Sequence, residues 1–436
     1  MKSVNQYVMK DSGVQWIGAV PEHWEVCRVK DLFMLTTGGT PKDFDQLNDE
    51  EDTIDWYTPV DIKEDANELF TSKRKLSLAL SQKNNIKIFP AHSLLFSGIG
   101  NVGKIGYLNN SGYANQQLTA LMPKRGYSKY YYYFLAAFKD PIKDNAFYTV
   151  VPIVNNSYIS AIPIALPPLS EQRAIADCLD AKCADIDAAI ELQQRMIDKL
   201  KAYKTAVIHQ AVTKGLDKNL KSTDLKDSGI KWLGMIPKHW DVVLVKNILR
   251  WKSVKGCGEK EVLSLYREYG VIPKSSRDDN HNVTSDNTDD YKLVEKGDFV
   301  INKMKAWQGS MGVSLYEGII SPAYYVCSFI NEKVYKPYFH YLMRDSSYFP
   351  EYKRLSGGIR VGQWDLGYDK FKSLPALLPP TLTEQRAIAD WLDAKCADID
   401  ATIALKEQKQ EKLKAYKKTI IFEYVTGKKQ VANINK

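Results

Sequence analysis

The chain has 436 residues, of which 44% are hydrophobic and 26% are charged, and its formal net charge at pH 7 is +8. These values are typical of a soluble globular protein with room for two or more domains, and the positive charge mildly favours an acidic partner. Because no apolar run approaches the roughly 20 residues of a membrane span and no signal-peptide core follows the first residues, we expect a cytoplasmic protein.

The first predicted element is a short box, residues 10–26, which is repeated with changes at residues 226–242. A second segment, residues 171–190, returns at residues 384–403 with only two differences. The order along the chain is therefore box, variable region, helix, and again box, variable region, helix. A repeat of this size indicates two copies of one unit. Two diverged variable regions on a duplicated frame suggest one task performed on two different targets.

The variable regions, residues 27–166 and 243–378, are expected to be α+β folds. Short apolar runs at 93–96 and 299–301, bounded by Gly, Pro and Asn, predict strands. A tyrosine-rich segment at 129–138 has a counterpart in the second copy. Such tyrosines could stack on bases, but the repeated amphipathic helix pattern favours packing in a core.

The charge of the first variable region changes sign along the chain. Residues 31–68 contain twelve acidic residues and two lysines, whereas residues 71–143 contain eleven Lys or Arg and one acidic residue. The second stretch could form a basic face that binds phosphates. The alternative is an ordinary solvated face of lysines.

Long helices are predicted directly after Pro167-Pro168 and Pro379-Pro380. Ser170 and Thr383 are suitable N-caps, and the following acidic residue favours the first turn. About 40 residues without Pro or Gly, at a rise of 1.5 Å per residue, give roughly 60 Å for each helix. Apolar residues recur every seven positions, with polar breaks at matching places. They are Leu179, Ile186, Leu200 and Val207, and Leu392, Ile399, Leu413 and Ile420, with breaks at Gln193 and Lys406.

Each of these helices carries a single apolar stripe, so neither is expected to be stable alone. An antiparallel pair with pseudo-two-fold symmetry would bury both stripes, and the alternative is a partner helix from another protein. Cys183 and Cys396 occupy the same position in the two copies. We interpret them as small buried residues, because the six cysteines show no spacing typical of a zinc site.

Residues 98–105 match most of two phosphate-binding patterns, but their context fits neither. The glycines Gly98, Gly100 and Gly103 satisfy a dinucleotide fingerprint. A phosphate loop needs Ser or Thr where Ile105 stands, and both motifs need a helix to begin there. The residues that follow predict a strand and a turn instead. Nucleotide binding is therefore not expected.

Catalytic chemistry has equally little support. Asp43, Asp61 and Lys63 match a metal-dependent nuclease site only loosely, and the Asn/Asp-Pro-Pro-aromatic motif of amino methylation is missing. His23 and His239 lie in the repeated box beside tryptophans, where a structural role is favoured. We expect no catalytic residue, no metal ligand and no cofactor.

The segment Pro-Pro-Leu-Ser-Glu-Gln-Arg-Ala-Ile-Ala at residues 167–176, followed by Leu-Asp-x-Lys-x-x-x-Ile-Asp, is duplicated after two unlike regions. This arrangement resembles the specificity subunit of type I restriction–modification systems, as does the box around Trp16, Pro21 and Trp24. The likeness covers nearly the whole chain. It implies two target recognition domains that each read half of a bipartite site on double-stranded DNA. It also implies helices that set the spacing and dock two methyltransferase subunits, motor–nuclease subunits in the full complex, and no catalytic residues.

The resemblance implies five segments. They are a first recognition domain (1–168), a first helix (169–215), a second recognition domain (216–381), a second helix (382–427) and a tail (428–436). A metal-dependent nuclease and a coiled-coil scaffold outside restriction remain alternatives, but the duplication and the diverged globular regions fit them less well.

Loops at matching places in the two copies carry side chains suited to DNA readout. Amide and forked side chains match base edges in the major groove, and cations bind phosphates. The predicted DNA-binding residues of the first copy are Asn101, Lys104, Asn115, Gln116, Gln117, Asn155 and Asn156. Those of the second copy are Lys303, Lys305, Trp307, Gln308, Arg360, Gln363 and Trp364. Any one of them could equally be an ordinary polar loop residue.

Overall fold

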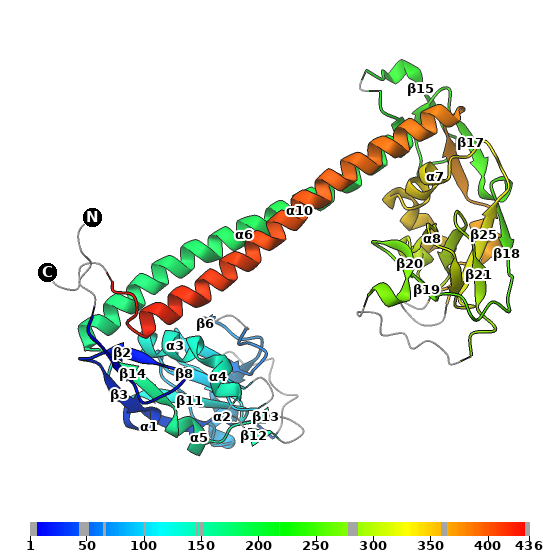
Figure 1. Cartoon of the computed structure of the whole chain (residues 1–436). Coiled ribbons are helices and arrows are strands. Elements are labelled where there is room, and N and C mark those ends of the chain that lie inside the picture. Colours follow the sequence, from blue (N-terminus) through cyan, green and yellow to red (C-terminus); the bar gives the residue numbers. More distant parts are fainter. Residues whose placement is uncertain are drawn as a thin grey trace, which may run out of the picture. The chain divides into compact units, whose positions relative to one another are not determined.

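The computed structural model forms two compact units (Figure 1). It describes residues 7–42, 52–63, 67–99, 102–144, 147–148, 152–217, 219–277, 287–358 and 364–431. Unit 1 comprises residues 1–193 and 408–436, and unit 2 comprises residues 194–407. Each unit therefore contains one box, one variable region and a part of each long helix. Among the described residues, no helix combines the length and apolarity that crossing a membrane requires.

Unit 1 is built on a five-stranded sheet with the order β4-β11-β8-β9-β6. Side chains alternate between the two faces of a strand. Leu94 and Phe96 of β8 therefore join the cluster that contains the tyrosines of helix α3, whereas Leu95 joins a separate cluster with Tyr57 and Ile62. The sheet strands and α3 are β4 (Phe33–Thr37), β6 (Asn67–Leu69), β8 (Leu94–Ser97), β9 (Ile105–Leu108), β11 (Leu118–Pro123) and α3 (Ser128–Ala137).

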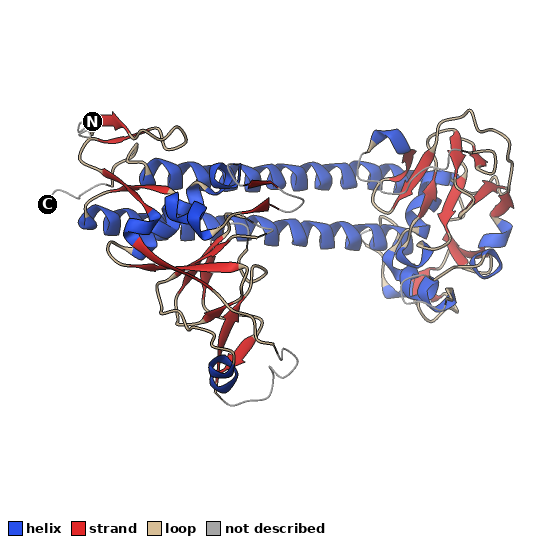
Figure 2. Cartoon of the chain, turned by 90° about the horizontal axis from the view of Figure 1, so that it is seen from below, coloured by secondary structure: helices blue, strands red, loops and turns tan. Residues whose placement is uncertain are grey.

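Smaller elements complete unit 1 (Figure 2). They include a three-stranded sheet with the order β10-β5-β7 and a pairing of β14 with β3. Their bounds are β1 (Met9–Asp11), β2 (Ala19–Pro21), β3 (Glu25–Arg28), α1 (Val29–Leu32), β5 (Thr53–Tyr57), β7 (Lys75–Ser77), α2 (Leu78–Lys83), β10 (Tyr113–Ala114), α4 (Lys139–Asp144), β12 (Phe147–Tyr148), β13 (Pro152–Ile153), α5 (Asn156–Ala161) and β14 (Pro163–Leu166).

Unit 2 repeats this plan with a sheet of the order β18-β25-β22-β23, which corresponds to β4-β11-β8-β9. The predicted strand at 299–301 is β22, and the counterpart of the tyrosine-rich segment forms α7, whose Tyr338 and Phe339 are fully buried. The bounds are β18 (Leu249–Lys252), β22 (Phe299–Asn302), β23 (Met311–Val313), β25 (Tyr324–Phe329) and α7 (Lys336–Met343). The core interpretation of both tyrosine-containing helices is confirmed.

The remaining elements of unit 2 are short, and those labelled η are 3-10 helices. They are η2 (Ser222–Asp224), β15 (Leu225–Asp227), β16 (Met235–Pro237), β17 (Asp241–Leu244), η3 (Val245–Asn247), β19 (Leu263–Tyr266), β20 (Gly270–Pro273), η4 (Lys274–Ser276), β21 (Lys292–Val294), η5 (Ala306–Gln308), β24 (Gly318–Ile320), η6 (Ser346–Tyr348), α8 (Phe349–Leu355), α9 (Tyr368–Phe371) and β26 (Pro375–Leu378).

The two long helices are α6 (Leu169–Lys214) and α10 (Leu382–Val425), with 46 and 44 residues. The expected N-caps at Ser170 and Thr383 are wrong, because both residues already lie inside the first helical turn. The helices begin within two residues of the Pro-Pro pairs, at Leu169 and Leu382, so each N-cap precedes the residue that was expected. In the second copy the Thr381 hydroxyl accepts a hydrogen bond from the Glu384 N–H at 3.2 Å.

The helices pair antiparallel within each unit, as predicted. In unit 1 the Lys417 ammonium lies 2.7 Å from the Asp187 carboxylate, and the Gln410 side chain donates to the Ile190 carbonyl. In unit 2 the equivalent ion pair is Lys204–Asp400 at 2.6 Å. Most of the heptad stripe is buried in both units, with Leu200 and Leu413 half-buried, and Cys183 and Cys396 are about 5–6% exposed. The interpretation of these cysteines as small buried residues is confirmed.

Each unit is completed by the end of the helix that belongs to the other copy. The Tyr130 hydroxyl of unit 1 donates to the Val425 carbonyl at the end of α10, and the Tyr338 hydroxyl of unit 2 donates to the Val212 carbonyl at the end of α6. Gly427 follows α10 with a φ of +69°, and a Cβ there would lie 2.3 Å from Pro21. Only glycine fits this turn. The last residues of the chain are therefore part of the unit that contains the first box.

Candidate nucleic-acid interface

A buried tryptophan–carboxylate contact joins each box to the start of a long helix. The Trp24 indole N–H donates to Glu171 at 3.0 Å, and the Trp240 indole N–H donates to Glu384 at 2.9 Å. His23 lies 2.8 Å from the same Glu171 carboxylate. A buried indole N–H needs an acceptor, so the box and the helix start depend on each other. His239 lies 3.1 Å from the Glu384 carboxylate in the same way, so both box histidines contact the carboxylate that accepts from the neighbouring indole.

A second pair of repeated contacts fixes the helices of the variable regions. The Gln172 side-chain oxygen accepts from the Tyr127 N–H at the start of α3, and Gln385 accepts from the Tyr335 N–H at the start of α7, both at 2.7 Å. The Tyr133 hydroxyl also donates to Asp180, and burial together with this hydrogen bond raises its pKa. The tyrosine therefore stays protonated and acts as a donor. Each variable region is thus attached to the start of one long helix by an equivalent contact.

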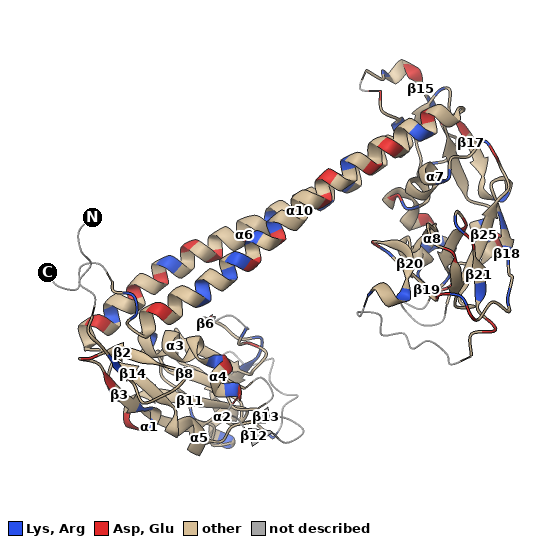
Figure 3. Cartoon of the chain, in the orientation of Figure 1, with Lys and Arg blue, Asp and Glu red and all other residues tan. Residues whose placement is uncertain are grey.

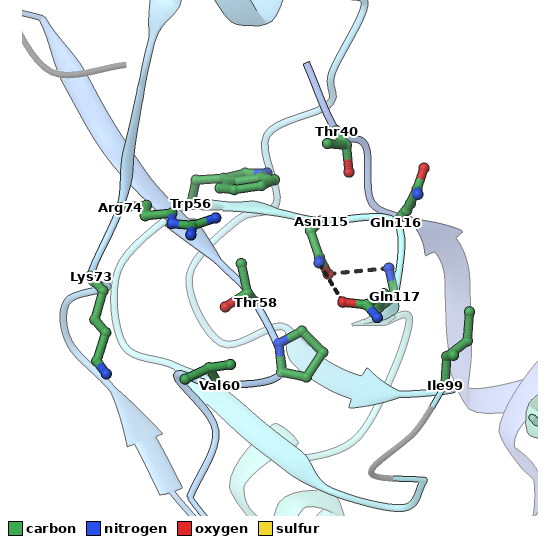
Figure 4. A pocket seen from close by; sticks show the side chains of 11 residues that line it. Thr40, Trp56, Thr58, Val60, Lys73, Arg74, Ile99, Asn115, Gln116 and Gln117 are labelled. Carbon is green, nitrogen blue, oxygen red and sulfur yellow. Dashed lines mark hydrogen bonds between the residues drawn. The ribbon is translucent and has the colours of Figure 1, made fainter. Parts of the chain in front are cut away.

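Unit 1 contains an open cavity of about 1000 Å³, lined by residues in or next to strands of its three-stranded and five-stranded sheets (Figure 4). Amide, cationic and apolar side chains share its wall. The lining residues are Thr40, Trp56, Thr58, Pro59, Val60, Lys73, Arg74, Ile99, Asn115, Gln116 and Gln117. Three of the predicted DNA-binding residues are therefore brought together with two cations.

The three amides of this cavity differ in what they can still bind. Asn115 is buried, and its side chain both accepts from the Gln117 N–H at 3.1 Å and donates to the Gln117 side-chain oxygen at 3.0 Å. These bonds stiffen the loop (Figure 4). Gln116 is exposed between them, and no described residue hydrogen-bonds with its side-chain amide. Gln116 is thus the amide best placed to read a base edge.

Lys73 and Arg74 are the cations of the cavity, and neither was among the DNA-binding residues predicted from the sequence. Both are exposed, and they belong to the basic stretch at 71–143. The positive charge of that stretch indicated a basic surface, but the sequence alone could not tell which of its eleven Lys and Arg residues line the cavity with the amides. Figure 3 shows how the basic and acidic residues are distributed over the described chain.

Of the other predicted residues of the first copy, Lys104, Asn155 and Asn156 do not line this cavity. Asn101 falls outside the described residues. The Lys104 ammonium donates to the Ile62 carbonyl at 3.4 Å. Asn155 caps α5 by accepting from the Tyr158 N–H at 2.8 Å, and Asn156 accepts from the Thr119 hydroxyl at 2.9 Å. These amides have structural partners, and their contact with DNA stays a prediction.

Those predicted residues of unit 2 that the structure describes lie in or beside the loop after strand β22. The Lys303 carbonyl accepts from the Leu366 N–H at 3.0 Å, so the loop after β22 lies against the segment that follows Trp364. The Trp307 and Trp364 rings are 5.3 Å apart, and the buried Trp307 indole N–H has no partner among the described residues. Lys305 and Gln308 lie in the same loop. Arg360 and Gln363 fall outside the described residues.

An aromatic cluster beside this loop was missed by sequence reasoning. Trp251, Tyr325 and Tyr368 have ring centroids within 5.5–5.7 Å of one another, and the Lys303 ammonium lies 5.8 Å above the Tyr325 ring. Burial lowers the pKa of the neighbouring Lys292, whose ammonium donates to two backbone carbonyls. The structure reveals the cluster through Trp251, which is 47% exposed in the edge strand β18.

Of the residues considered for a nuclease site, Asp61 is engaged in hydrogen bonds within its own part of unit 1. Both carboxylate oxygens of Asp61 accept hydrogen bonds from its own loop and from the Lys73 N–H. Asp43 falls outside the described residues. Within the described part of the chain, no three His, Cys, Asp or Glu side chains are grouped so that they could hold a metal ion.

Two globular units on a duplicated helical frame, each presenting different loops, define a class of protein with paired recognition domains. The model of the type I restriction modification DNA specificity domain matches residues 21–202 and 237–415. The chain therefore belongs to this family, and the resemblance seen in its sequence is confirmed.

One curated relative matches this chain almost end to end, and another matches a shorter part of it. The chain is 28% identical over 444 residues to the type I restriction enzyme MjaVIII specificity subunit of Methanocaldococcus jannaschii, with 95% of each chain covered. It is also 27% identical to the EcoBI specificity subunit of Escherichia coli over 122 residues, which are 28% of this chain and 26% of that protein.

Solved structures support the fold. A chain from a study of complex assembly and conformational transition of the type I R-M system has a TM-score of 0.68 at 13% identity, with 94% of this chain and 99% of that chain covered. The HsdS subunit from Thermoanaerobacter tengcongensis has a TM-score of 0.50 at 13% identity, with 94% and 98% covered.

Proposed function

We propose that this chain is the DNA specificity subunit of a type I restriction–modification enzyme and reads a bipartite site on double-stranded DNA. Unit 1 reads one half-site and unit 2 reads the other, and the chain neither cuts nor methylates DNA by itself. One observation carries this proposal. The two units share the Trp–Glu and Gln–backbone contacts of their frame, yet they present unlike loops, which is what two different half-sites require.

The loops supply the chemistry for readout. In unit 1 an exposed amide, Gln116, shares a cavity with Lys73 and Arg74. In unit 2 lysines and tryptophans meet after β22. Amides and forked cations distinguish base edges in the major groove, while lysines bind phosphates irrespective of sequence. Each unit thus offers both kinds of contact.

The exposed face of the repeated helix segment is the proposed docking site for methyltransferase subunits. Asp177 and Asp185 of the first copy and Asp390 and Asp398 of the second are exposed, and no described residue pairs with their carboxylates. Small alanines lie between them at helical spacing. Identical exposed residues in both copies are expected when the same partner binds twice. Two methyltransferase subunits, with motor–nuclease subunits in the full complex, fit this duplication.

The proposal is tested by methylome sequencing of cells with and without this gene. We expect an asymmetric bipartite methylated motif to disappear with the gene and to return with the wild-type copy. Complementation with Gln116→Ala should relax only one half of the motif, because a bidentate base contact is worth about 1–3 kcal/mol. A motif that survives deletion, or robust methylation or cleavage by the purified chain alone, would contradict the proposal.

Neutralising a phosphate-binding lysine is expected to weaken specific and non-specific binding alike. Lys73→Ala in unit 1 and Lys305→Ala in unit 2 should each flatten the dependence of log K on log salt by about 0.9, since each releases one counterion less. Lys104→Ala and Lys303→Ala test the remaining predicted cations in the same way. Lys414→Ala is the control, because its ammonium pairs with Glu411 on α10. An unchanged slope shows that the lysine in question does not contact phosphate.

A further inference from the structure

Val60 is an apolar side chain held out into solvent at the wall of the unit 1 cavity. It is 72% exposed, whereas Tyr57 and Ile62 on either side are at most 1% exposed. Figure 4 shows Val60 on the same wall as Lys73, with Gln116 on the far side of the cavity. An exposed valine is not unusual alone. Its setting among cations and an unpaired amide is what needs explanation.

The turn that carries Val60 is rigid. Asp61 accepts hydrogen bonds from the Thr58 N–H and the Thr58 hydroxyl, both at 2.8 Å, and from the Lys73 N–H at 3.1 Å. Its own N–H donates to the Thr58 carbonyl. The buried Tyr57 and Ile62 anchor both ends of the turn in one cluster. A contact made by Val60 therefore costs little ordering of the backbone.

The occupant of this cavity is indicated by its charge. Lys73 and Arg74 favour a phosphate backbone, and Gln116 is a partner for a base edge. A valine can form no hydrogen bond with DNA. In the major groove the only apolar group that a base presents is the 5-methyl group of thymine.

We infer that Val60 contacts the 5-methyl group of a thymine in the half-site read by unit 1, and so acts as a specificity-determining residue. The inference rests on the proposed function and adds the chemistry of one base position to it. The methyl group packs against the valine while the neighbouring cations hold the backbone of the duplex. Removal of that one methyl is expected to weaken binding roughly three- to five-fold, which is the effect of burying one such group.

The test replaces each thymine of both half-sites by deoxyuridine, one at a time, and measures binding of the assembled complex in competition assays. Deoxyuridine keeps the base pairing and lacks only the methyl group. For the wild type we expect one position, in one half-site, at which the replacement weakens binding three- to five-fold. For Val60→Ala we expect the same loss on the natural duplex and no further loss with deoxyuridine at that position.

Val8→Ala is the matched control, because Val8 is 71% exposed in the same unit but does not line the cavity. It should leave both duplexes unaffected, and thermal unfolding of both variants should match the wild type. A thymine effect that persists in Val60→Ala, or a half-site in which no thymine replacement matters, overturns the inference. Specific binding of the natural bipartite site would still stand in that case, so the failure is distinct from failure of the proposed function.

Discussion

Lengthening both long helices by four residues is expected to widen the gap between the two half-sites by nearly two base pairs while the half-site sequences stay the same. Four residues add about 6 Å to a helix, and two base pairs add about 7 Å to the duplex. The insertions follow Gln193 in α6 and Glu407 in α10, which are the boundaries of the two units in the sequence. They therefore preserve the ion pairs and core contacts inside each unit.

The rotation that the four inserted residues add to the helix favours the same outcome. Four helical residues turn about 40° beyond one full turn, and two base pairs turn the duplex about 70° in the same sense. The remaining mismatch of about 30° is small enough for one new spacing to be favoured. An insertion into α6 alone is the control, because it breaks the register with α10 and should lower stability.

Selection of DNA targets by the lengthened protein in its assembled complex measures this directly. Recovery of the original spacing would show that the helices do not set the distance between half-sites. New half-site bases would show that the helices take part in readout. Both outcomes are distinguishable from misfolding, because a misfolded complex selects no site.

Replacing Trp24 by Ala is expected to destabilise unit 1 by about 3–5 kcal/mol and to leave unit 2 folded. Trp24 is 1% exposed, and its indole N–H is bonded to the Glu171 carboxylate. The substitution removes a large core side chain and leaves the carboxylate without its donor. Trp240→Ala should do the same in unit 2, where the equivalent indole is bonded to Glu384.

Hydrogen exchange of the full chain separates these outcomes. In Trp24→Ala, protection should fall in residues 408–425 at the far end of the sequence as well as in the first variable region, because both belong to unit 1. Residues 382–407 of the same helix should keep their protection. Trp391→Ala, a tryptophan 40% exposed on α10, is the control and should change little. Uniform loss along all of α10 would contradict the division of the helix between two units.

Much of the architecture followed from the repeated segments and from hydrophobic periodicity. The stripe every seven residues predicted α6 and α10, and the duplication predicted their antiparallel pairing, because two like stripes can bury each other with pseudo-two-fold symmetry. Short apolar runs predicted β8 and β22, and the amphipathic pattern placed the tyrosines of α3 in the core. These features depend on the spacing of apolar residues, which is local information.

The details of the site depended on contacts between segments far apart in the sequence. Lys73 and the amide loop at Gln116 line the same cavity only because separate strands fold back beside each other. Asn115 was expected to face DNA, yet the fold gives its amide a partner in Gln117. The N-cap of α10 moved from Thr383 to Thr381 for a similar reason, since the tight connection after the Pro-Pro pair decides where the helix begins.

The duplication, the helical pairing and the family were determined by the amino-acid sequence, because repeats and periodicity survive without any knowledge of the third dimension. Which residues share a unit was decided by tertiary structure. The end of α10 closes the unit that holds the first box, where Tyr130 binds the Val425 carbonyl, and the end of α6 closes the other. Hydrogen bonds and packing across nearly three hundred residues of sequence leave no local pattern, so only the folded chain brings them together.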